Sequence, residues 1–201
     1  YDIKVPWELS RCQHLVWLGQ AYWFTADERY AREFVGQVSN WIEQNPWPLG
    51  VNWSSTMDVA ILVVNWLWGY YYFIESPSLD TTFQINFLES LLAHGRHIYR
   101  NLEWSPSLTT NHYLADIIGL IYLGFFFPEF KESARWLEYG LGELEKEMFK
   151  QVYPDGVSFE ASTSYHRLAT EMFLSATLLA RYNGHEMSAS FMDRLEKMLD
   201  F

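Results

Sequence analysis

The sequence predicts an all-α fold, namely an incomplete α/α toroid of about eight antiparallel helices arranged as helical hairpins in two layers. Two observations predict it. Apolar residues recur at helical spacing in long segments, and short loops rich in Pro, Gly and Ser separate those segments. No segment alternates apolar and polar residues as a half-buried strand does. No repeat of fixed period is visible, which favours an irregular toroid over a regular solenoid.

The first half of the chain contains four predicted helices. Asp27 is a typical N-cap residue for the second, and the Pro-rich loop 45–50 ends that helix. The third is apolar nearly all round, so we expect it to be buried on more than one side. Cys12 lies in the first, and we expect it to be a small buried residue. The four helices cover, approximately, Glu8–Phe24, Asp27–Gln44, Ser55–Glu75 and Thr81–Asn101.

The second half contains four more predicted helices. Pro128 and the turn residues 153–156 separate neighbouring helices, and Asn183-Gly184 is a typical helix stop. Because the chain begins at Tyr1 rather than Met and ends inside a helical pattern, we expect residues 1–201 to be a single toroid domain from a longer protein. The helices cover, approximately, Thr110–Phe126, Lys131–Lys150, Ser162–Tyr182 and a segment from Met187 onward.

Composition argues against two classes of partner. A net charge of −11 argues against nucleic acid, which is bound through Lys and Arg. No apolar run approaches the roughly 18–20 residues of a membrane span. Aromatic residues make up 18% of the chain, with 10 Trp. Most of them are explained by a hydrophobic core built from large rings. A surplus of rings is also what a sugar-binding groove would show, because the flat faces of sugars stack on them. The same negative net charge is unfavourable for binding a polyanionic substrate.

Three pairs of residues stand near the N-terminal ends of the third, fifth and seventh predicted helices. They are Asn52-Trp53, Asn111-His112 and Tyr165-His166. Inner helices of a toroid run in the same direction, so we expect these pairs to gather on one rim. A side chain at a helix start can be held rigidly while its tip stays open to a groove. Amide, imidazole and phenol groups can together take a proton from carbon and return one to a leaving oxygen.

Other interpretations of these residues stay open. Asn111 is also a good N-cap residue, and a Tyr at a helix start is more often packed than catalytic. Asp116 follows His112 by one helical turn and could orient its imidazole. Glu160 could bond backbone amides at the start of the seventh predicted helix.

Carboxylates and histidines offer two further chemistries. Asp58, Asp116 and Glu160 all lie near the predicted rim, and two carboxylates flanking a glycosidic bond can hydrolyse it. His94 and His97 stand three residues apart on one predicted helix, but no third ligand is apparent. We therefore expect no metal site in this chain.

Several short motifs occur along most of the chain in a characteristic order. They are Trp7-Glu8-Leu9-Ser10-Arg11, Gln20-Ala21-Tyr22, Trp41-Ile42-Glu43-Gln44-Asn45-Pro46, Gly50-Val51-Asn52-Trp53, Asn111-His112, Phe127-Pro128-Glu129-Phe130, and Pro154-Asp155-Gly156 through Glu160 to Ser164-Tyr165-His166-Arg167. In this order and spacing they resemble the N-terminal α/α toroid of the heparinase II/III family, which is related to certain alginate and oligoalginate lyases.

The resemblance implies a polysaccharide lyase that cleaves a uronic-acid-containing polysaccharide by β-elimination, without a cofactor in this chain. It implies that Asn111, helped by His112, neutralises the uronate carboxylate and so acidifies the neighbouring C–H. Tyr165 would donate a proton to the leaving oxygen and is also a candidate base. The residues that would bind substrate are Gln13, Asn52, Trp53, Glu160 and His166.

The resemblance also implies a periplasmic or secreted location and a C-terminal β-sandwich domain, which nothing in this sequence resembles. One departure concerns the third predicted helix, where the family has Glu and, four residues on, Arg; this chain has Asp58 and Leu62. The sequence therefore favours an enzyme but leaves two alternatives. One is a non-catalytic polysaccharide-binding or assembly domain, and the other is an α/α-toroid glycoside hydrolase that uses paired carboxylates.

Overall fold

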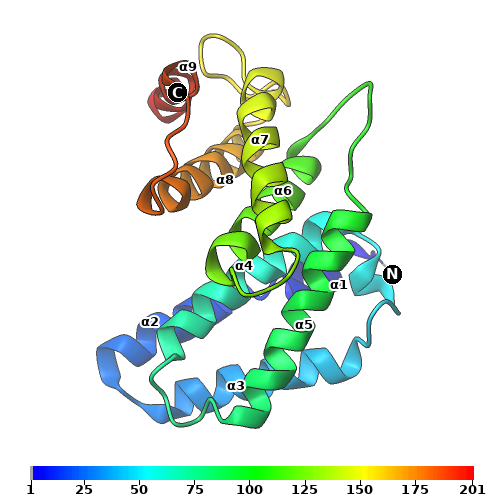
Figure 1. The fold of residues 1–201 in the computed structure, drawn as a ribbon, viewed down its shortest axis with the longest axis vertical. Helices are drawn as coiled ribbons and strands as arrows, with labels where there is room; N and C mark the ends of the chain where they lie inside the picture. Colours follow the sequence, from blue (N-terminus) through cyan, green and yellow to red (C-terminus); the bar gives the residue numbers. More distant parts are fainter. Residues whose placement is uncertain (1) are drawn as a thin grey trace. The chain divides into compact units, whose positions relative to one another are not determined.

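The computed structural model describes residues 2–201, whose regular secondary structure is helical apart from one isolated β-bridge between Val152 and Ser158 (Figure 1). The predicted all-α class is confirmed. Contacts divide the chain into two compact units, unit 1 ending at Asn101 and unit 2 beginning at Leu102. Each unit is described by itself, and the single domain expected over residues 1–201 stays a prediction.

Unit 1 is built around one central helix, α4, which contacts α1, α2, α3 and α5. As predicted, α4 is buried on more than one side: Val59, Leu62, Val63 and Trp66 are all inaccessible or nearly so. Ser55 caps it, and its Oγ accepts a hydrogen bond from the backbone N of Asp58. The helices of unit 1 are α1 Lys4–Ser10, α2 His14–Thr25, α3 Glu28–Gln44, the 3₁₀ helix η1 Val51–Trp53, α4 Thr56–Phe73 and α5 Thr81–Arg100.

The single helix predicted over Glu8–Phe24 is wrong, because the chain breaks between α1 and α2. Cys12 has φ 55°, a left-handed conformation that ends α1. Contacts from α4 hold the break: the Arg11 carbonyl accepts a hydrogen bond from Asn65 Nδ2 at 2.8 Å, and its side chain pairs with Asp58. Cys12 itself is buried as expected, and burial raises the pKa of its thiol to about 11.

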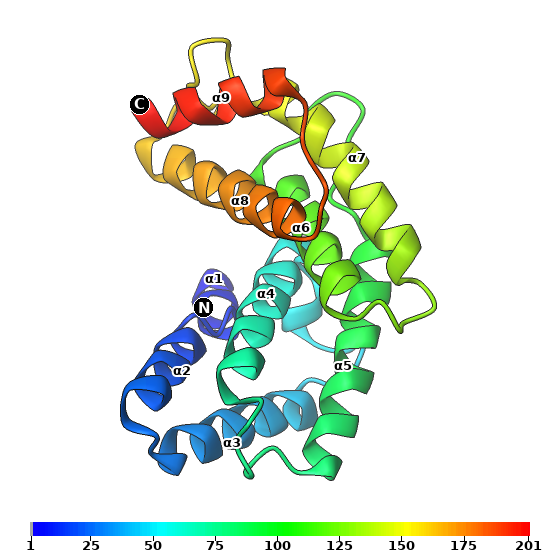
Figure 2. The ribbon, with the colours of Figure 1, turned by 60° about the vertical axis from the view of Figure 1, so that its left-hand side comes forward.

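Unit 2 is built around α6, which contacts both α7 and α8. The residues from Tyr113 to Gly124 are all buried, so this helix forms the core of the unit. α9 contacts α7 and α8, and Figure 2 shows it running along α8. The helices of unit 2 are α6 Asn111–Phe126, α7 Ser133–Gln151, α8 Thr163–Tyr182 and α9 Ala189–Asp200.

Two glycines allow close approaches within unit 2. Gly140 of α7 faces Ile121 of α6, and a Cβ there would lie 2.6 Å from Ile121 Cγ1. Gly156, in the turn before α8, has φ +94°, and a Cβ there would lie 2.5 Å from the backbone of Lys197 on α9. Larger residues would separate α6 from α7, or the turn from α9.

Candidate functional site

The N-terminal end of α6 carries the Asn-His pair singled out by the sequence. Thr110 is the N-cap, and its Oγ1 accepts a hydrogen bond from the backbone N of His112 at 3.3 Å. The alternative in which Asn111 caps this helix is therefore wrong. Asn111 is the first helical residue, so its backbone N–H and its amide are available for other partners.

Those partners are the two oxygens of the Glu160 carboxylate. Asn111 Nδ2 lies 2.8 Å from both Oε1 and Oε2, and the backbone N of Asn111 lies 2.9 Å from Oε1. The carboxylate thus sits at the positive end of α6, where a helix favours an anion. The alternative in which Glu160 bonds backbone amides at the start of α8 is not the contact observed: Glu160 bonds the start of α6, because the loop that carries it folds back against α6.

The residues just before Asn111 are braced from α7. The buried Glu147 accepts hydrogen bonds from Thr109 Oγ1 at 2.5 Å and from Gln151 Nε2 at 2.8 Å. Gln151 Nε2 also donates to the Thr110 carbonyl at 3.0 Å, and Lys150 Nζ lies 2.6 Å from Glu147 Oε1. These contacts fix the backbone from which Asn111 and His112 project.

His112 is half exposed, and its ring contacts a carboxylate from the loop ahead of α6. Its Nδ1 lies 2.6 Å from Glu103 Oε2. Asp116, which had been considered as the residue that orients this imidazole, instead accepts a hydrogen bond from the backbone N of Glu103 at 2.7 Å. Asp116 is fully buried, and burial, with the nearby Glu103 charge, raises its pKa to about 8.

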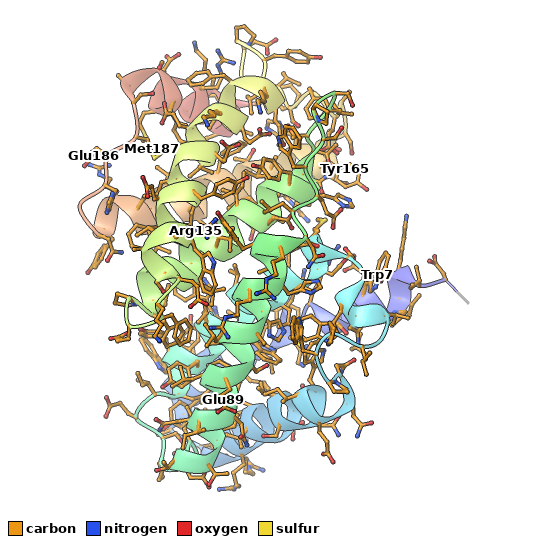
Figure 3. The ribbon with its side chains drawn as sticks, turned by 45° about the vertical axis from the view of Figure 1, so that its right-hand side comes forward. Trp7, Glu89, Arg135, Tyr165, Glu186 and Met187 are labelled. Carbon is orange, nitrogen blue, oxygen red and sulfur yellow. The ribbon has the colours of Figure 1, made fainter. Side chains whose placement is uncertain are left out.

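Tyr165 and His166 differ sharply, although they are adjacent. Tyr165 stands in the first turn of α8 with 48% of its surface exposed, and it projects outward from unit 2 (Figure 3). His166 is buried, and its Nδ1 accepts a hydrogen bond from the backbone N of Ser158 at 3.2 Å while Nε2 lies 3.0 Å from the Met198 carbonyl. Both nitrogens of His166 are therefore engaged within the fold, whereas Tyr165 presents its ring to solvent.

Three of the expected substrate-binding residues lie in unit 1. Gln13 is exposed at the start of α2. Asn52 Nδ2 donates to Asn45 Oδ1 at 2.8 Å, and Trp53 Nε1 donates to the Asn45 carbonyl at 3.1 Å. Trp53 is only 5% exposed, and its ring packs 4.4 Å from that of His94. It belongs to the core of unit 1, and the prediction that these residues share a rim with those of unit 2 stays a prediction.

Asp58, the family-motif position on α4, is buried and paired. Arg11 Nε lies 2.7 Å from Asp58 Oδ1, and Ser55 Oγ donates to Asp58 Oδ2 at 2.5 Å. Leu62, four residues on, is buried in the core. The cation that faces Asp58 is thus supplied from the break between α1 and α2.

His94 and His97 of α5 are buried beside the ring of Trp53 in unit 1. His94 is fully buried among aromatic rings, and burial lowers its pKa to about 4. Across the described residues 2–201, no cluster of three or more His, Cys, Asp or Glu side chains is suited to hold a metal ion.

Sequence reasoning missed three residues that organise these sites: Glu103, Glu147 and Arg11. Glu103 stands in a loop without periodicity, so only its folding against α6 reveals its contact with His112. Glu147 looks like an ordinary member of a charged helix, yet it is fully buried. Arg11 belongs to a motif, but no spacing in the sequence links it to Asp58.

None of the helices that the structure describes has the length and apolar character needed to cross a membrane. Comparison with known proteins gives a consistent result. Residues 1–201 match the family described as Heparinase II/III N-terminus. A heparin-sulfate lyase from Pedobacter heparinus is 33% identical over 98% of this chain and 30% of its own length. A heparin-sulfate lyase from Bacteroides stercoris is 31% identical over 100% of this chain and 33% of its own length.

Solved structures agree with the sequence comparison. The crystal structure of heparan sulfate lyase HepC from Pedobacter heparinus has a TM-score of 0.80 and 32% identity, covering 100% of this chain and 32% of that one. A heparinase III structure, the BT4657 gene product, has a TM-score of 0.78 and 31% identity, covering 100% of this chain and 34% of that one. The chain thus spans about a third of the length of these relatives. With a family match over its whole length, it belongs to the heparinase II/III family and corresponds to the N-terminal helical domain of these lyases.

Proposed function

We propose that this chain is the helical part of a polysaccharide lyase that cleaves a heparan-sulfate-like, uronic-acid-containing chain by β-elimination. Family membership supports the reaction class, and the names of the relatives support the substrate class. One observation within unit 2 carries the proposal: Glu160 ties the start of α6 to the segment that leads into α8. Asn111 and His112 on α6 and Tyr165 on α8 follow directly from the two segments that this contact joins, which supports the proposal.

In the proposed reaction, Asn111 and His112 neutralise the carboxylate of the uronate. This stabilises the enolate that forms when a base removes the proton from the carbon next to the carboxylate. The electron pair then forms a carbon–carbon double bond, and the glycosidic C–O bond on the following carbon breaks. Tyr165 donates the proton that the leaving oxygen takes up, and it is also the candidate base.

The Asn111 amide has a competitor for this role. Its Nδ2 already donates to both oxygens of Glu160, and its Oδ1 is buried. A uronate carboxylate that used the Nδ2 hydrogens would have to displace at least one oxygen of Glu160. His112 is half exposed, so it is the more accessible of the two groups to substrate.

The burial and pairing of the carboxylates argue against the hydrolase alternative. Within unit 1, Asp58 is buried in its pair with Arg11. Within unit 2, Asp116 is fully buried and Glu160 is bound by Asn111. A glycosidase needs a carboxylic acid and a carboxylate that both reach the glycosidic bond. The occupied Asn111 amide favours the non-catalytic binding domain as the second candidate.

The decisive experiment compares the intact protein with its Tyr165→Phe variant on a panel of heparan sulfate, hyaluronan, alginate and bacterial exopolysaccharides. Ultraviolet absorbance of the unsaturated uronate reports elimination, and calorimetry reports binding. We expect Tyr165→Phe to lower turnover by roughly a hundredfold or more while binding is kept. Tyr182→Phe is the matched control, because Tyr182 lies on the same helix and is 94% exposed.

Each alternative outcome has a distinct meaning. Binding without any absorbance change in the unaltered protein would favour the non-catalytic domain. New reducing ends without an unsaturated product would favour hydrolysis. Equal turnover of Tyr165→Phe and Tyr182→Phe would remove Tyr165 from the chemistry.

A further inference from the structure

The imidazole of His112 is held by a residue outside its own helix. Glu103 lies in the loop ahead of α6, and its Oε2 is 2.6 Å from His112 Nδ1. So short a distance is typical of a charge-assisted hydrogen bond. His112 is 48% exposed and Glu103 is 29% exposed, so solvent screens the pair only in part.

Glu103 is fixed in turn by Asp116. The backbone N of Glu103 donates to Asp116 Oδ2 at 2.7 Å, and Asp116 is fully buried on α6, one turn after His112. Burial and the Glu103 charge together raise the pKa of Asp116 to about 8. At neutral pH Asp116 is therefore mostly protonated. It anchors the Glu103 backbone without adding a second negative charge beside the Glu103–His112 pair.

We propose that Glu103 is the positioning residue for His112: its carboxylate keeps a proton on Nδ1 and stabilises the imidazolium form of the ring. A histidine whose Nδ1–H is bound by a carboxylate has a defined tautomer and orientation. In the imidazolium form Nε2 also carries a proton, and the positive charge of the ring would attract the uronate carboxylate. The catalytic part of this inference rests on the proposed lyase function, whereas the effect of Glu103 on the titration of His112 does not.

Other titratable groups lie on α6 and on the segments that contact it. They are Asp116 on α6, Glu160 on the loop before α8, Tyr165 on α8, and Glu147 and Lys150 on α7. Glu103→Gln leaves these side chains in place, but it also removes a charge that helps to raise the pKa of Asp116. The comparison is therefore repeated in an Asp116→Asn background, where a difference made by Glu103→Gln reports the Glu103 charge alone.

The test is the titration of His112 in the intact protein, followed by NMR with labelled histidine. Its resonance is identified by its loss in His112→Gln. Glu103→Gln keeps the length of the side chain and removes its charge. We expect the His112 midpoint to fall by about half a pH unit, the size expected for a partly exposed ion pair. Glu171→Gln is the control, since it removes an exposed carboxylate on α8 and should leave the midpoint unchanged.

Kinetics supply the second measurement. If the imidazolium binds the uronate, kcat/KM falls as pH rises through the pKa of His112, and Glu103→Gln moves that fall to lower pH. Glu103→Asp keeps the charge on a shorter side chain, so its pH profile should lie between those of the unaltered protein and Glu103→Gln. That result separates a charge effect from misfolding. Circular dichroism checks that each variant is folded.

The outcomes separate this inference from the proposed function. An unchanged His112 midpoint in folded Glu103→Gln overturns the inference even if substrate is cleaved. A shifted midpoint with cleavage but an unmoved pH profile overturns the positioning role. A shifted midpoint in a protein that cleaves no polysaccharide overturns the lyase proposal and leaves the effect of Glu103 on His112 supported.

Discussion

Asn111 donates three hydrogen bonds to the Glu160 carboxylate, one from its backbone and two from its side-chain amide, at 2.8–2.9 Å. Glu160 thereby occupies the anion-binding position at the N-terminal end of α6. The contact joins residues 49 positions apart and fastens the segment before α8 to the start of α6.

Glu160→Ala should destabilise the protein. The variant leaves the backbone N–H and amide of the buried Asn111 without their acceptor, and such groups cost about 1–3 kcal/mol each when unsatisfied. Urea unfolding should show a lower midpoint than Glu171→Ala, which removes an exposed carboxylate from α8. Equal midpoints for the two variants would mean that Glu160 contributes little to holding α6.

Asp116 should make stability depend on pH. Its pKa is raised from 3.8 to about 8, so the native state holds a proton that the unfolded state has lost. The contribution of Asp116 to the free energy of unfolding is fully present below about pH 4 and is lost as pH rises towards 8. The total loss is on the order of a few kcal/mol.

Asp116→Asn replaces the neutral carboxyl by a neutral amide that can still accept from Glu103. We expect the unfolding free energy of this variant, relative to the unaltered protein, to rise steadily between about pH 5 and pH 8. Taking the difference between the two unfolding free energies cancels the contributions of the other titrating groups. Asp200→Asn, on the exposed end of α9, is the control and should give a difference that does not vary with pH. A flat difference for Asp116→Asn would show that the buried carboxyl titrates normally.

The contact between α6 and α7 should not tolerate a methyl group at Gly140. A Cβ there would lie 2.6 Å from Ile121 Cγ1 and 3.2 Å from the Ile117 carbonyl oxygen, so Gly140→Ala should cost about 1–3 kcal/mol. Gly142→Ala, on the same helix, meets nothing within 4 Å and should stabilise the protein by about 0.5–1 kcal/mol. The thermal unfolding midpoint should therefore fall for Gly140→Ala and rise for Gly142→Ala. Equal shifts would contradict close packing at Gly140.

Arg11 should be required for the stability of unit 1. Arg11→Met keeps most of the aliphatic packing but leaves the buried Asp58 carboxylate without its cation, which costs about 3–5 kcal/mol in comparable pairs. The double variant Arg11→Met/Asp58→Asn removes both charges and should recover much of that loss. Urea unfolding measures the stability of the single and the double variant. No recovery in the double variant would assign the loss to packing rather than to the buried charge.

The sequence by itself determined the helices and many of their ends. Apolar periodicity placed α3 to α8, and the start of α9, within a few residues of their observed bounds, because a helix that buries one face must repeat apolar residues at its own period. Asp27 was identified as a cap correctly, because a cap acts on amides only two or three residues away. Motif order along the chain was enough to indicate the family.

Tertiary structure decided the break at Cys12, which local periodicity does not predict because α4 supplies the contacts that hold it. It also decided the partners of the candidate residues. Glu160 reaches Asn111, Glu103 reaches His112, and Arg11 reaches Asp58 across 49, 9 and 47 positions. Such contacts arise from the way helices and loops fold back on one another. No periodic signal in the sequence records them, because the pairing of polar side chains depends on which loops meet in space.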